Sequence, residues 1–149
     1  QAGVNTAVES CLLASREAME AMLPVTDQFL VDIKFLDPVL HKMHLGADNR
    51  VILENFQWLL AHGARVLVRT PLIPGYTAAE DNIRAIARYL RRNAPQTPWE
   101  LLNFNPLCRG KYTALEQDYP VSGGSLTQAE LQRFYDILEQ EGITNIVKE

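Results

Sequence analysis

Short apolar runs of strand length alternate along this chain with longer segments whose apolar residues recur at helical spacing. The strand-like runs are residues 3–9, 29–34, 65–69 and 99–104, and residues 143–147 could form a short final strand. Helical patterns lie between them, in residues 12–23, 38–44 and 49–61 and in segments that start at residues 77 and 127. Strands that alternate with helices predict right-handed βαβ units and a parallel sheet. We therefore expect an α/β fold in a single domain over residues 1–149.

Proline and capping residues set the expected element boundaries. Pro71 should end the third strand, because proline has no N–H for a strand ladder. Asn49 is a candidate N-cap for the helix that follows it. Thr77 with Glu80, and Thr127 with Glu130, have the spacing of a capping box. A long polar loop is expected between residues 109 and 125.

Composition excludes several classes of protein. The formal net charge of −4 gives no reason to expect nucleic acid or a membrane surface as a partner, and no apolar run approaches the length of a membrane span. Cys11 and Cys108 are too few and too far apart for a disulfide framework, which favours a cytoplasmic setting. The first residue is Gln1 rather than Met, so we expect a piece of a longer protein.

At the carboxyl ends of four expected strands, one face of the strand becomes polar. The polar residues are Glu9, Asp32 with Lys34, Arg69 and Asn105, whereas the opposite faces are apolar. In parallel α/β folds the ligand crevice lies at the carboxyl ends of the strands. Two carboxylates, two cations and an amide that converge there predict a site for a ligand with both an amino and a carboxylate group.

Purely structural interpretations exist for the same residues. Lys34 and Arg69 could be strand ends that reach solvent, and Asp32 could be only the ion-pair partner of Lys34. His41 and His44 have a spacing that can hold a metal, but no third ligand is near them in sequence. A solvated helix face explains the two histidines better, and we assign no metal ligand.

Five stretches resemble, in order, motifs of the radical S-adenosylmethionine enzymes that activate glycyl radical enzymes, the pyruvate formate-lyase activating enzyme group. They are Asn5-Thr-Ala-Val-Glu-Ser10, Val31-Asp-Ile-Lys34, Ile52-Leu-Glu-Asn55, Arg69-Thr-Pro-Leu-Ile-Pro-Gly-Tyr76, and Asn103-Phe-Asn-Pro-Leu107 followed by Gly110-Lys-Tyr112. The resemblance implies the C-terminal portion of a partial (β/α)6 TIM-type barrel, with parallel strands and helices on the outer face.

The resemblance also implies a reaction for the intact enzyme. A [4Fe–4S] cluster donates an electron to S-adenosylmethionine, and the 5′-deoxyadenosyl radical that forms takes a hydrogen from a backbone glycine of a glycyl radical enzyme. Flavodoxin or ferredoxin would supply the electron. The family holds its cluster with Cys-x3-Cys-x2-Cys and the methionyl amino group with Gly-Gly-Glu, and this sequence contains neither motif. We therefore expect the missing strands before Gln1 and no activity from this chain alone.

By matching position, the resemblance gives roles to the strand-end residues. Asp32 and Lys34 would lie on the S-adenosylmethionine and substrate side of the barrel. Glu9 would sit near the cofactor's carboxylate and share a monovalent cation with Asp32. Arg69 would hold the cofactor or the incoming glycine loop, and Asn105 stands where some members have histidine. No catalytic residue is assigned to this chain.

Two other functions remain open on sequence grounds. Lys34 at a strand end could form a Schiff base, as in a class I aldolase. The polar loop of residues 109–125 could instead dock a partner in a module without chemistry.

Overall fold

Five parallel strands form the sheet, in the order in which they occur along the chain. The computed structural model describes residues 3–148. The strands are β1 (Ala7–Ser10), β2 (Gln28–Asp32), β3 (Val66–Leu72), β4 (Trp99–Asn103) and β5 (Ile146–Val147). The parallel α/β prediction is confirmed, because each strand pairs with the next in parallel register.

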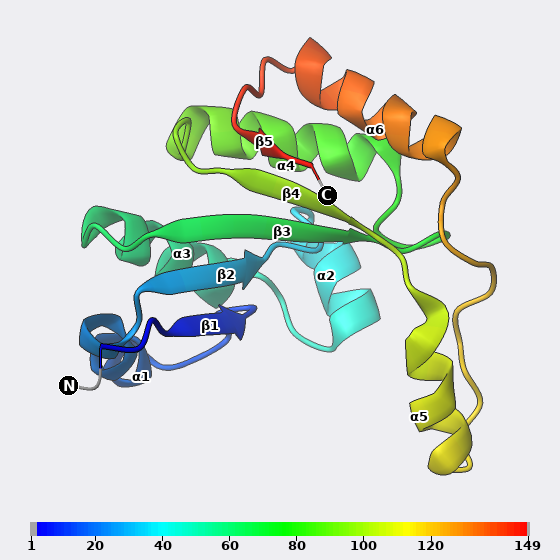
Figure 1. Ribbon diagram of the computed structural model, residues 1–149, viewed down its shortest axis with the longest axis horizontal. Coiled ribbons are helices and arrows are strands. Elements are labelled where there is room, and N and C mark those ends of the chain that lie inside the picture. The colour runs from blue at the N-terminus through cyan, green and yellow to red at the C-terminus, as the bar shows by residue number, and fades with distance from the viewer. Residues whose placement is uncertain (1–2, 149) are drawn as a thin grey trace.

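Helices follow the strands, and most of them lie on one face of the sheet. The helices are α1 (Arg16–Met22), α2 (Pro38–Leu45), α3 (Arg50–Ala61), α4 (Glu80–Asn93), α5 (Arg109–Ala114) and α6 (Gln128–Gln140), with short 3-10 turns η1 (Leu23–Val25) and η2 (Pro106–Cys108). Figure 1 looks onto the open face of β1–β3, with α2, α3 and α4 behind the strands. Among residues 3–148, no helix has the length and apolar character needed to cross a membrane.

The core lies between the sheet and these helices. Alternate strand residues point into it, and Val31, Val68 and Trp99 are fully buried. They pack against helix residues such as Phe56 and Ile86. Full burial of each large apolar side chain contributes about 1.5–3 kcal/mol. The sheet is thus anchored on its helix side, which leaves the other face for polar groups.

Pro71 does not end the third strand as predicted. β3 continues through Pro71 to Leu72, and Pro71 is paired with Leu102 of β4. Arg69 accepts a backbone hydrogen bond from Ile33, so the odd-numbered residues of β3 direct their backbone groups toward β2. β2 has already ended at Asp32, so Pro71 needs no N–H at its position.

One of the two expected capping boxes forms. Thr127 and Glu130 make reciprocal hydrogen bonds at the start of α6, as predicted. The prediction of a capping box at Thr77 is wrong, because α4 begins only at Glu80 and has no side-chain cap. The Thr77 hydroxyl is engaged in the preceding turn, where it accepts from Ile73 N and bonds to the carbonyl of Pro71. Tertiary use of the hydroxyl therefore overrides the local motif.

The segment of residues 109–125 is not a simple loop as expected. It contains α5, which projects away from the sheet and is followed by an irregular segment that runs back toward α6 (Figure 1). Cys108 Sγ lies 3.0 Å from the hydroxyl oxygen of Tyr119, and this hydrogen bond raises the pKa of Tyr119 to about 12. Arg109 Nη2 donates to the carbonyl of Gly123 at 2.5 Å. Residues 108–123 are therefore held together mainly by contacts within this segment.

The first strand and helix also start later than predicted. β1 begins at Ala7 rather than residue 3, and α1 begins at Arg16 rather than residue 12. Just before β1, Thr6 N donates to the carboxylate of Asp27, and the Thr6 carbonyl accepts from the backbone N–H of Asp27 and Gln28. Leu12 adopts a φ of 62°, a left-handed conformation that a helix cannot contain.

Candidate functional site

Four of the five predicted site residues meet on the open face of the sheet. Asp32 of β2 is the register partner of Arg69 of β3. Glu9 of β1 pairs with Leu30, which lies two residues before Asp32 in β2. Lys34 lies two residues after Asp32, just beyond the end of β2. These residues alternate with the buried ones, so their side chains share the face that no helix covers.

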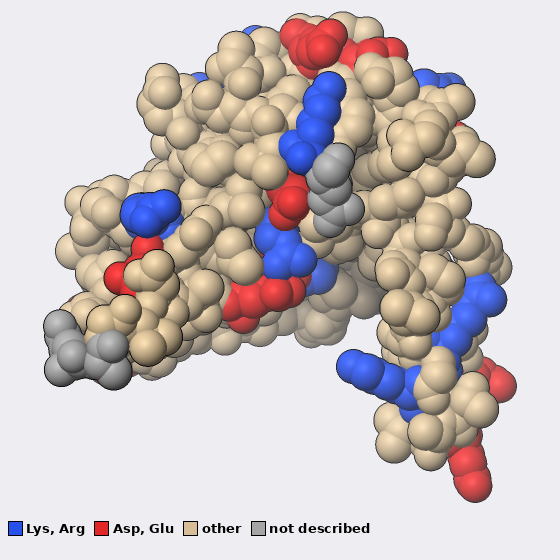
Figure 2. Space-filling model, viewed as in Figure 1, with Lys and Arg blue, Asp and Glu red and all other residues tan. Residues whose placement is uncertain are grey.

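Two ion pairs link these side chains. Lys34 Nζ lies 2.8 Å from Asp32 Oδ2, and both side chains are about one-fifth exposed, at 24% and 19%. Arg69 Nη1 lies 2.9 Å from Glu9 Oε2, in a pair whose carboxylate is 59% exposed. Figure 2 shows positive and negative side chains meeting in a band across the centre of this face. The face therefore offers both signs of charge within one small area.

Glu100 is a member of the cluster that sequence reasoning missed. It is the β4 register partner of Arg69, and its Oε2 lies 3.6 Å from Arg69 Nε, with the carboxylate only 15% exposed. The signal was present, because a charged residue stands between Trp99 and Leu101 in an otherwise apolar run. Glu100 points away from the core that these two neighbours fill.

Two buried polar atoms of the cluster have no hydrogen-bond partner among the described residues. They are Asp32 Oδ1 and Arg69 Nε, the latter at an ion-pair distance that is too long for a hydrogen bond. Unpaired buried polar groups are costly and call for an explanation. Here each atom belongs to an ion-paired side chain, Asp32 paired with Lys34, and Arg69 with Glu9 and Glu100.

Asn105 does not join this cluster. Asn105 was expected on the polar face, but the even-numbered Glu100 and Leu102 occupy that face of β4. Asn103 is turned toward the start of α6, where its side chain bonds to both backbone groups of Leu126 at 2.8 and 2.9 Å. The Oδ1 of Asn105 accepts from Leu107 N at 3.1 Å and caps η2.

Buried asparagines in or directly before the helices fasten the loops that carry the site. Asn55 of α3 donates to the carbonyls of Leu12 and Ala14, in the loop after β1, at 3.0 and 2.9 Å. Asn49 donates to the carbonyls of Phe35 and Leu36, after β2, at 3.0 and 2.8 Å. The side chain of Asn49 was predicted to cap α3. It makes no capping hydrogen bond and binds the loop after β2 instead.

Asn82 is the third of these asparagines and contacts the site most directly. Its Nδ2 donates to the carbonyl of Lys34 at 2.9 Å and to that of Thr77 at 3.2 Å. Its Oδ1 accepts from Leu36 N at 3.3 Å. One side chain of α4 thereby joins the ends of β2 and the loop after β3, which fixes the backbone that carries Lys34.

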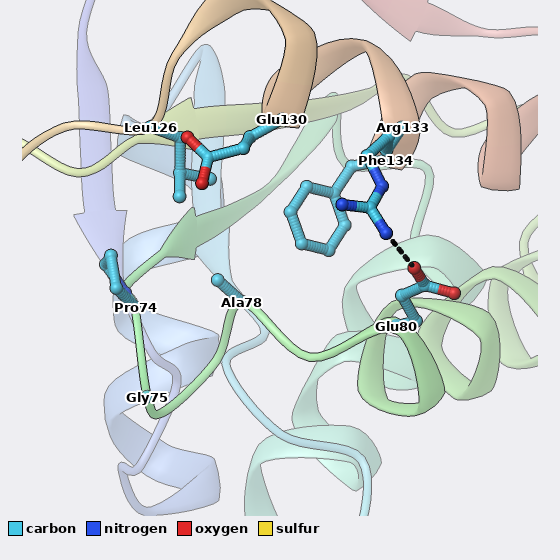
Figure 3. A pocket seen from close by; sticks show the side chains of 8 residues that line it. All are labelled: Pro74, Gly75, Ala78, Glu80, Leu126, Glu130, Arg133 and Phe134. Carbon is cyan, nitrogen blue, oxygen red and sulfur yellow. Dashed lines mark ion pairs between the residues drawn. The ribbon is translucent and has the colours of Figure 1, made fainter.

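A separate hollow of about 300 Å³ lies between the loop after β3 and the start of α6 (Figure 3). Its floor includes Pro74, Leu126 and Phe134. Two charged residues at its rim, Arg133 and Glu80, form an ion pair at 3.7 Å. This hollow contains none of the predicted site residues and belongs to the outer layer of the fold.

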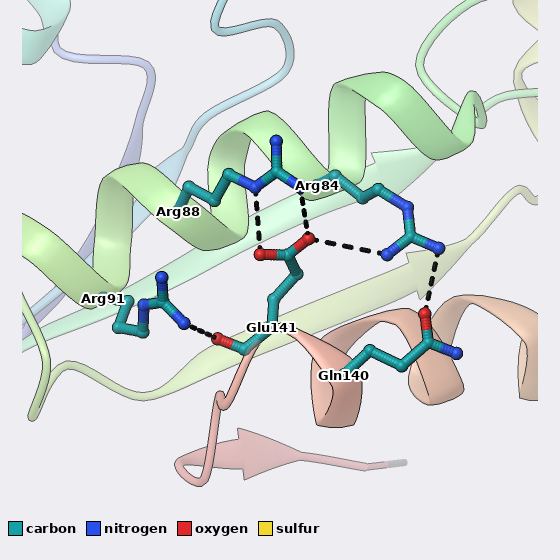
Figure 4. Close-up of polar contacts among 5 residues, drawn as sticks. All are labelled: Arg84, Arg88, Arg91, Gln140 and Glu141. Carbon is teal, nitrogen blue, oxygen red and sulfur yellow. Dashed lines mark hydrogen bonds and ion pairs between the residues drawn. The ribbon is translucent and has the colours of Figure 1, made fainter.

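Glu141 joins α4 to the end of α6 (Figure 4). Arg88 donates to both carboxylate oxygens of Glu141, at 3.0 and 2.8 Å, and Arg84 contributes a contact at 3.5 Å. Arg91 donates to the backbone carbonyl of Glu141 at 2.9 Å. The hydrogen bonds from Arg88 lower the pKa of Glu141, because they favour its charged form.

Sequence comparison finds relatives that are activating enzymes. It is 35% identical to the choline trimethylamine-lyase activating enzyme of Oleidesulfovibrio alaskensis, over 89% of this chain and 44% of that protein. It is 38% identical to the isethionate sulfite-lyase activating enzyme of Nitratidesulfovibrio vulgaris, over 92% and 45%. It is also 38% identical to the benzylsuccinate synthase activating enzyme of Thauera aromatica, over 86% and 40%. The chain thus spans less than half the length of each of these relatives. No protein-family model matches it.

Solved structures show the same fold. A domain of a pyruvate-formate lyase-activating enzyme from Bacteroides vulgatus matches with a TM-score of 0.74 and 24% identity, over 98% of this chain and 83% of that one. SuiB of Streptococcus suis, solved with S-adenosylmethionine bound, matches with a TM-score of 0.70 and 12% identity, over 98% and 33%. The five parallel strands therefore have the fold of the corresponding part of these structures. The chain is a homologue, over part of their length, of the glycyl-radical-enzyme activating enzymes of the radical S-adenosylmethionine family.

Proposed function

We propose that this chain forms one wall of the S-adenosylmethionine site in a glycyl-radical-enzyme activating enzyme. The observation that carries the proposal is the gathering of Glu9, Asp32, Lys34 and Arg69 on the open face, around the carboxyl end of β2. Ligands of parallel α/β barrels bind at that end. The remaining strands of the barrel and the cluster ligands would come from sequence outside these 149 residues.

The residues present fit the methionyl end of S-adenosylmethionine. That end carries an amino group and a carboxylate, and the open face holds carboxylates and cations side by side. Asp32 and Lys34 would face the cofactor and the substrate, and Arg69 would hold a carboxylate of the cofactor or the incoming glycine loop. Glu9 would lie near the cofactor's carboxylate and share a monovalent cation with Asp32. Asn105 is left out, because its side-chain oxygen caps η2.

The residues present do not fit the iron–sulfur cluster. The sequence has two cysteines, Cys11 and Cys108, and residues 3–148 contain no group of three or more His, Cys, Asp or Glu that could hold a metal ion. A [4Fe–4S] cluster takes thiolate ligands that this set does not supply. In the intact enzyme, S-adenosylmethionine would supply the radical chemistry, while this chain binds and orients it.

The partner would be a glycyl radical enzyme, with flavodoxin or ferredoxin as electron donor. The names of the three relatives give different lyases or synthases as the enzymes they activate, so the family alone does not specify the partner. Those names favour an activating enzyme over a class I aldolase that uses Lys34.

Titration of the isotopically labelled chain with S-adenosylmethionine, followed by NMR, tests the proposal. We expect shifts in the backbone amides near Glu9, Asp32 and Arg69. Arg69→Met should weaken binding about tenfold or more, because a hydrogen bond to a charged group is lost. Arg50→Met is the matched control, since the Arg50 side chain is 75% exposed and is ion-paired with the exposed Glu54 of α3 at 3.9 Å. Shifts confined to another surface, or equal effects of the two variants, would contradict the proposal.

A further inference from the structure

We propose that Glu100 is a positioning residue, which holds the Arg69 guanidinium over the centre of the open face so that Arg69 can receive a carboxylate of the ligand. The inference rests on the proposed function for the identity of that ligand. It assigns Glu100 no contact with the ligand, and its role is exerted through Arg69.

The two carboxylates beside Arg69 are not equivalent. Glu9 comes from β1, which pairs only with β2 among the described strands, and its side chain is 59% exposed. Glu100 comes from β4, the direct neighbour of β3, and its side chain is 15% exposed. Water screens an exposed ion pair, and holding its long side chains costs entropy, so such pairs contribute little. The partner that fixes Arg69 is therefore Glu100.

The geometry separates the two ends of the guanidinium. Glu9 takes the terminal Nη1 at 2.9 Å, whereas Glu100 faces the Nε side at 3.6 Å. Nε itself has no hydrogen-bond partner among the described residues. The charge of Glu100 thus orients the guanidinium from the β4 side without consuming its Nε–H. The terminal nitrogens stay directed toward β1 and β2, where the ligand would lie.

Without Glu100 the guanidinium would be drawn toward Glu9 alone. Arginine has several rotatable bonds, and binding is strongest when its planar donors are held in place beforehand. The loss of the Glu100 charge should therefore weaken the binding of ligands that carry a carboxylate and leave the binding of other ligands unchanged. A residue that merely fills space on β4 would not make that distinction.

Two variants of Glu100 separate charge from packing. Glu100→Gln keeps the size and removes the charge, whereas Glu100→Asp keeps the charge and shortens the side chain. The readout is the NMR signal of the Arg69 Nε–H, which is assigned by its disappearance in Arg69→Lys. We expect the largest change in Glu100→Gln, a smaller change in Glu100→Asp and the smallest in Glu9→Gln. A larger change in Glu100→Asp than in Glu100→Gln, or in Glu9→Gln than in either, would overturn the proposal.

Ligand affinity gives an independent readout in the same variants. S-adenosylmethionine and 5′-methylthioadenosine share the adenosine portion, but only the first carries the amino acid group. Glu100→Gln should weaken S-adenosylmethionine binding about tenfold and leave 5′-methylthioadenosine unchanged. Equal weakening of both ligands would contradict the positioning role. If the wild-type chain bound neither, the proposed function would fail, while the order of the Arg69 signals would still decide the role of Glu100.

Discussion

Asn82→Leu should destabilise the chain and loosen the backbone that carries Lys34. Asn82 is 8% exposed and makes three hydrogen bonds, at 2.9, 3.2 and 3.3 Å, to the backbone of Lys34, Thr77 and Leu36. Leucine has a similar size but no polar atom, so it would leave two carbonyls and one N–H without this partner. The substitution therefore removes the polar contacts while creating little empty space.

The expected cost follows from those three bonds. Each contributes about 0.5–1.5 kcal/mol net, and a buried group left unpaired costs about 1–3 kcal/mol. Since part of the site is accessible to water, we expect a loss of about 2–4 kcal/mol in the free energy of unfolding. For a chain of this length that corresponds to a fall in melting temperature of roughly 5–15 °C.

Urea unfolding and thermal melting measure the loss, and hydrogen exchange of the Leu36 amide reports the loop directly. Asn93→Leu is the control on the same helix, because Asn93 is exposed and its side chain donates to the Tyr89 carbonyl at 2.9 Å, one turn earlier in α4. We expect that control to change stability by less than about 0.5 kcal/mol. A loss in Asn82→Leu no greater than in Asn93→Leu, with unchanged exchange at Leu36, would refute the assigned role of Asn82.

Three further predictions follow from the same structure. Thr127→Ala should cost about 1 kcal/mol, measured by urea unfolding, because it breaks the capping box of α6; no loss would argue against that box. Glu141→Gln should lower the melting temperature at neutral pH. The pKa of Glu141 is lowered in the folded chain, so its stabilising effect is complete above the pKa of an unfolded glutamate, about 4.3, and is lost as the pH falls through the folded pKa. The wild-type and variant melting temperatures should therefore converge in acid, and a constant gap would contradict this assignment. Anaerobic reconstitution of this chain with iron and sulfide should give no [4Fe–4S] absorption, whereas a stable cluster held by Cys11 or Cys108 would contradict the account of the site.

The order of strands could be predicted because it depends on local patterns. Apolar runs that alternate with helical segments lead to βαβ units, and their right-handed connection places consecutive strands side by side. The common face of Asp32 and Arg69 follows from the alternation of side chains along a strand, which has a period of two, but Arg69 lies in the middle of β3 and not at its end. Thr127 was also predictable, because its capping partner lies only three residues away.

The missed features depend on tertiary contacts that sequence spacing does not specify. Thr77 has the same local motif as Thr127, but its hydroxyl is taken by the turn after β3. The role of Glu100 depends on the register of β4 against β3. Asn82 acts on Lys34 from 48 residues away, so nothing near it in sequence indicates its partner.

The central claim is that the open face of the sheet, around Glu9, Asp32, Lys34 and Arg69, receives S-adenosylmethionine. A crystal structure of this chain grown with S-adenosylmethionine tests it most directly. The account predicts density for the methionyl group on that face, with its carboxylate within hydrogen-bond distance of Arg69 or Lys34. Ordered cofactor bound elsewhere, such as in the hollow beside Pro74 and Phe134, with the open face empty, would contradict it.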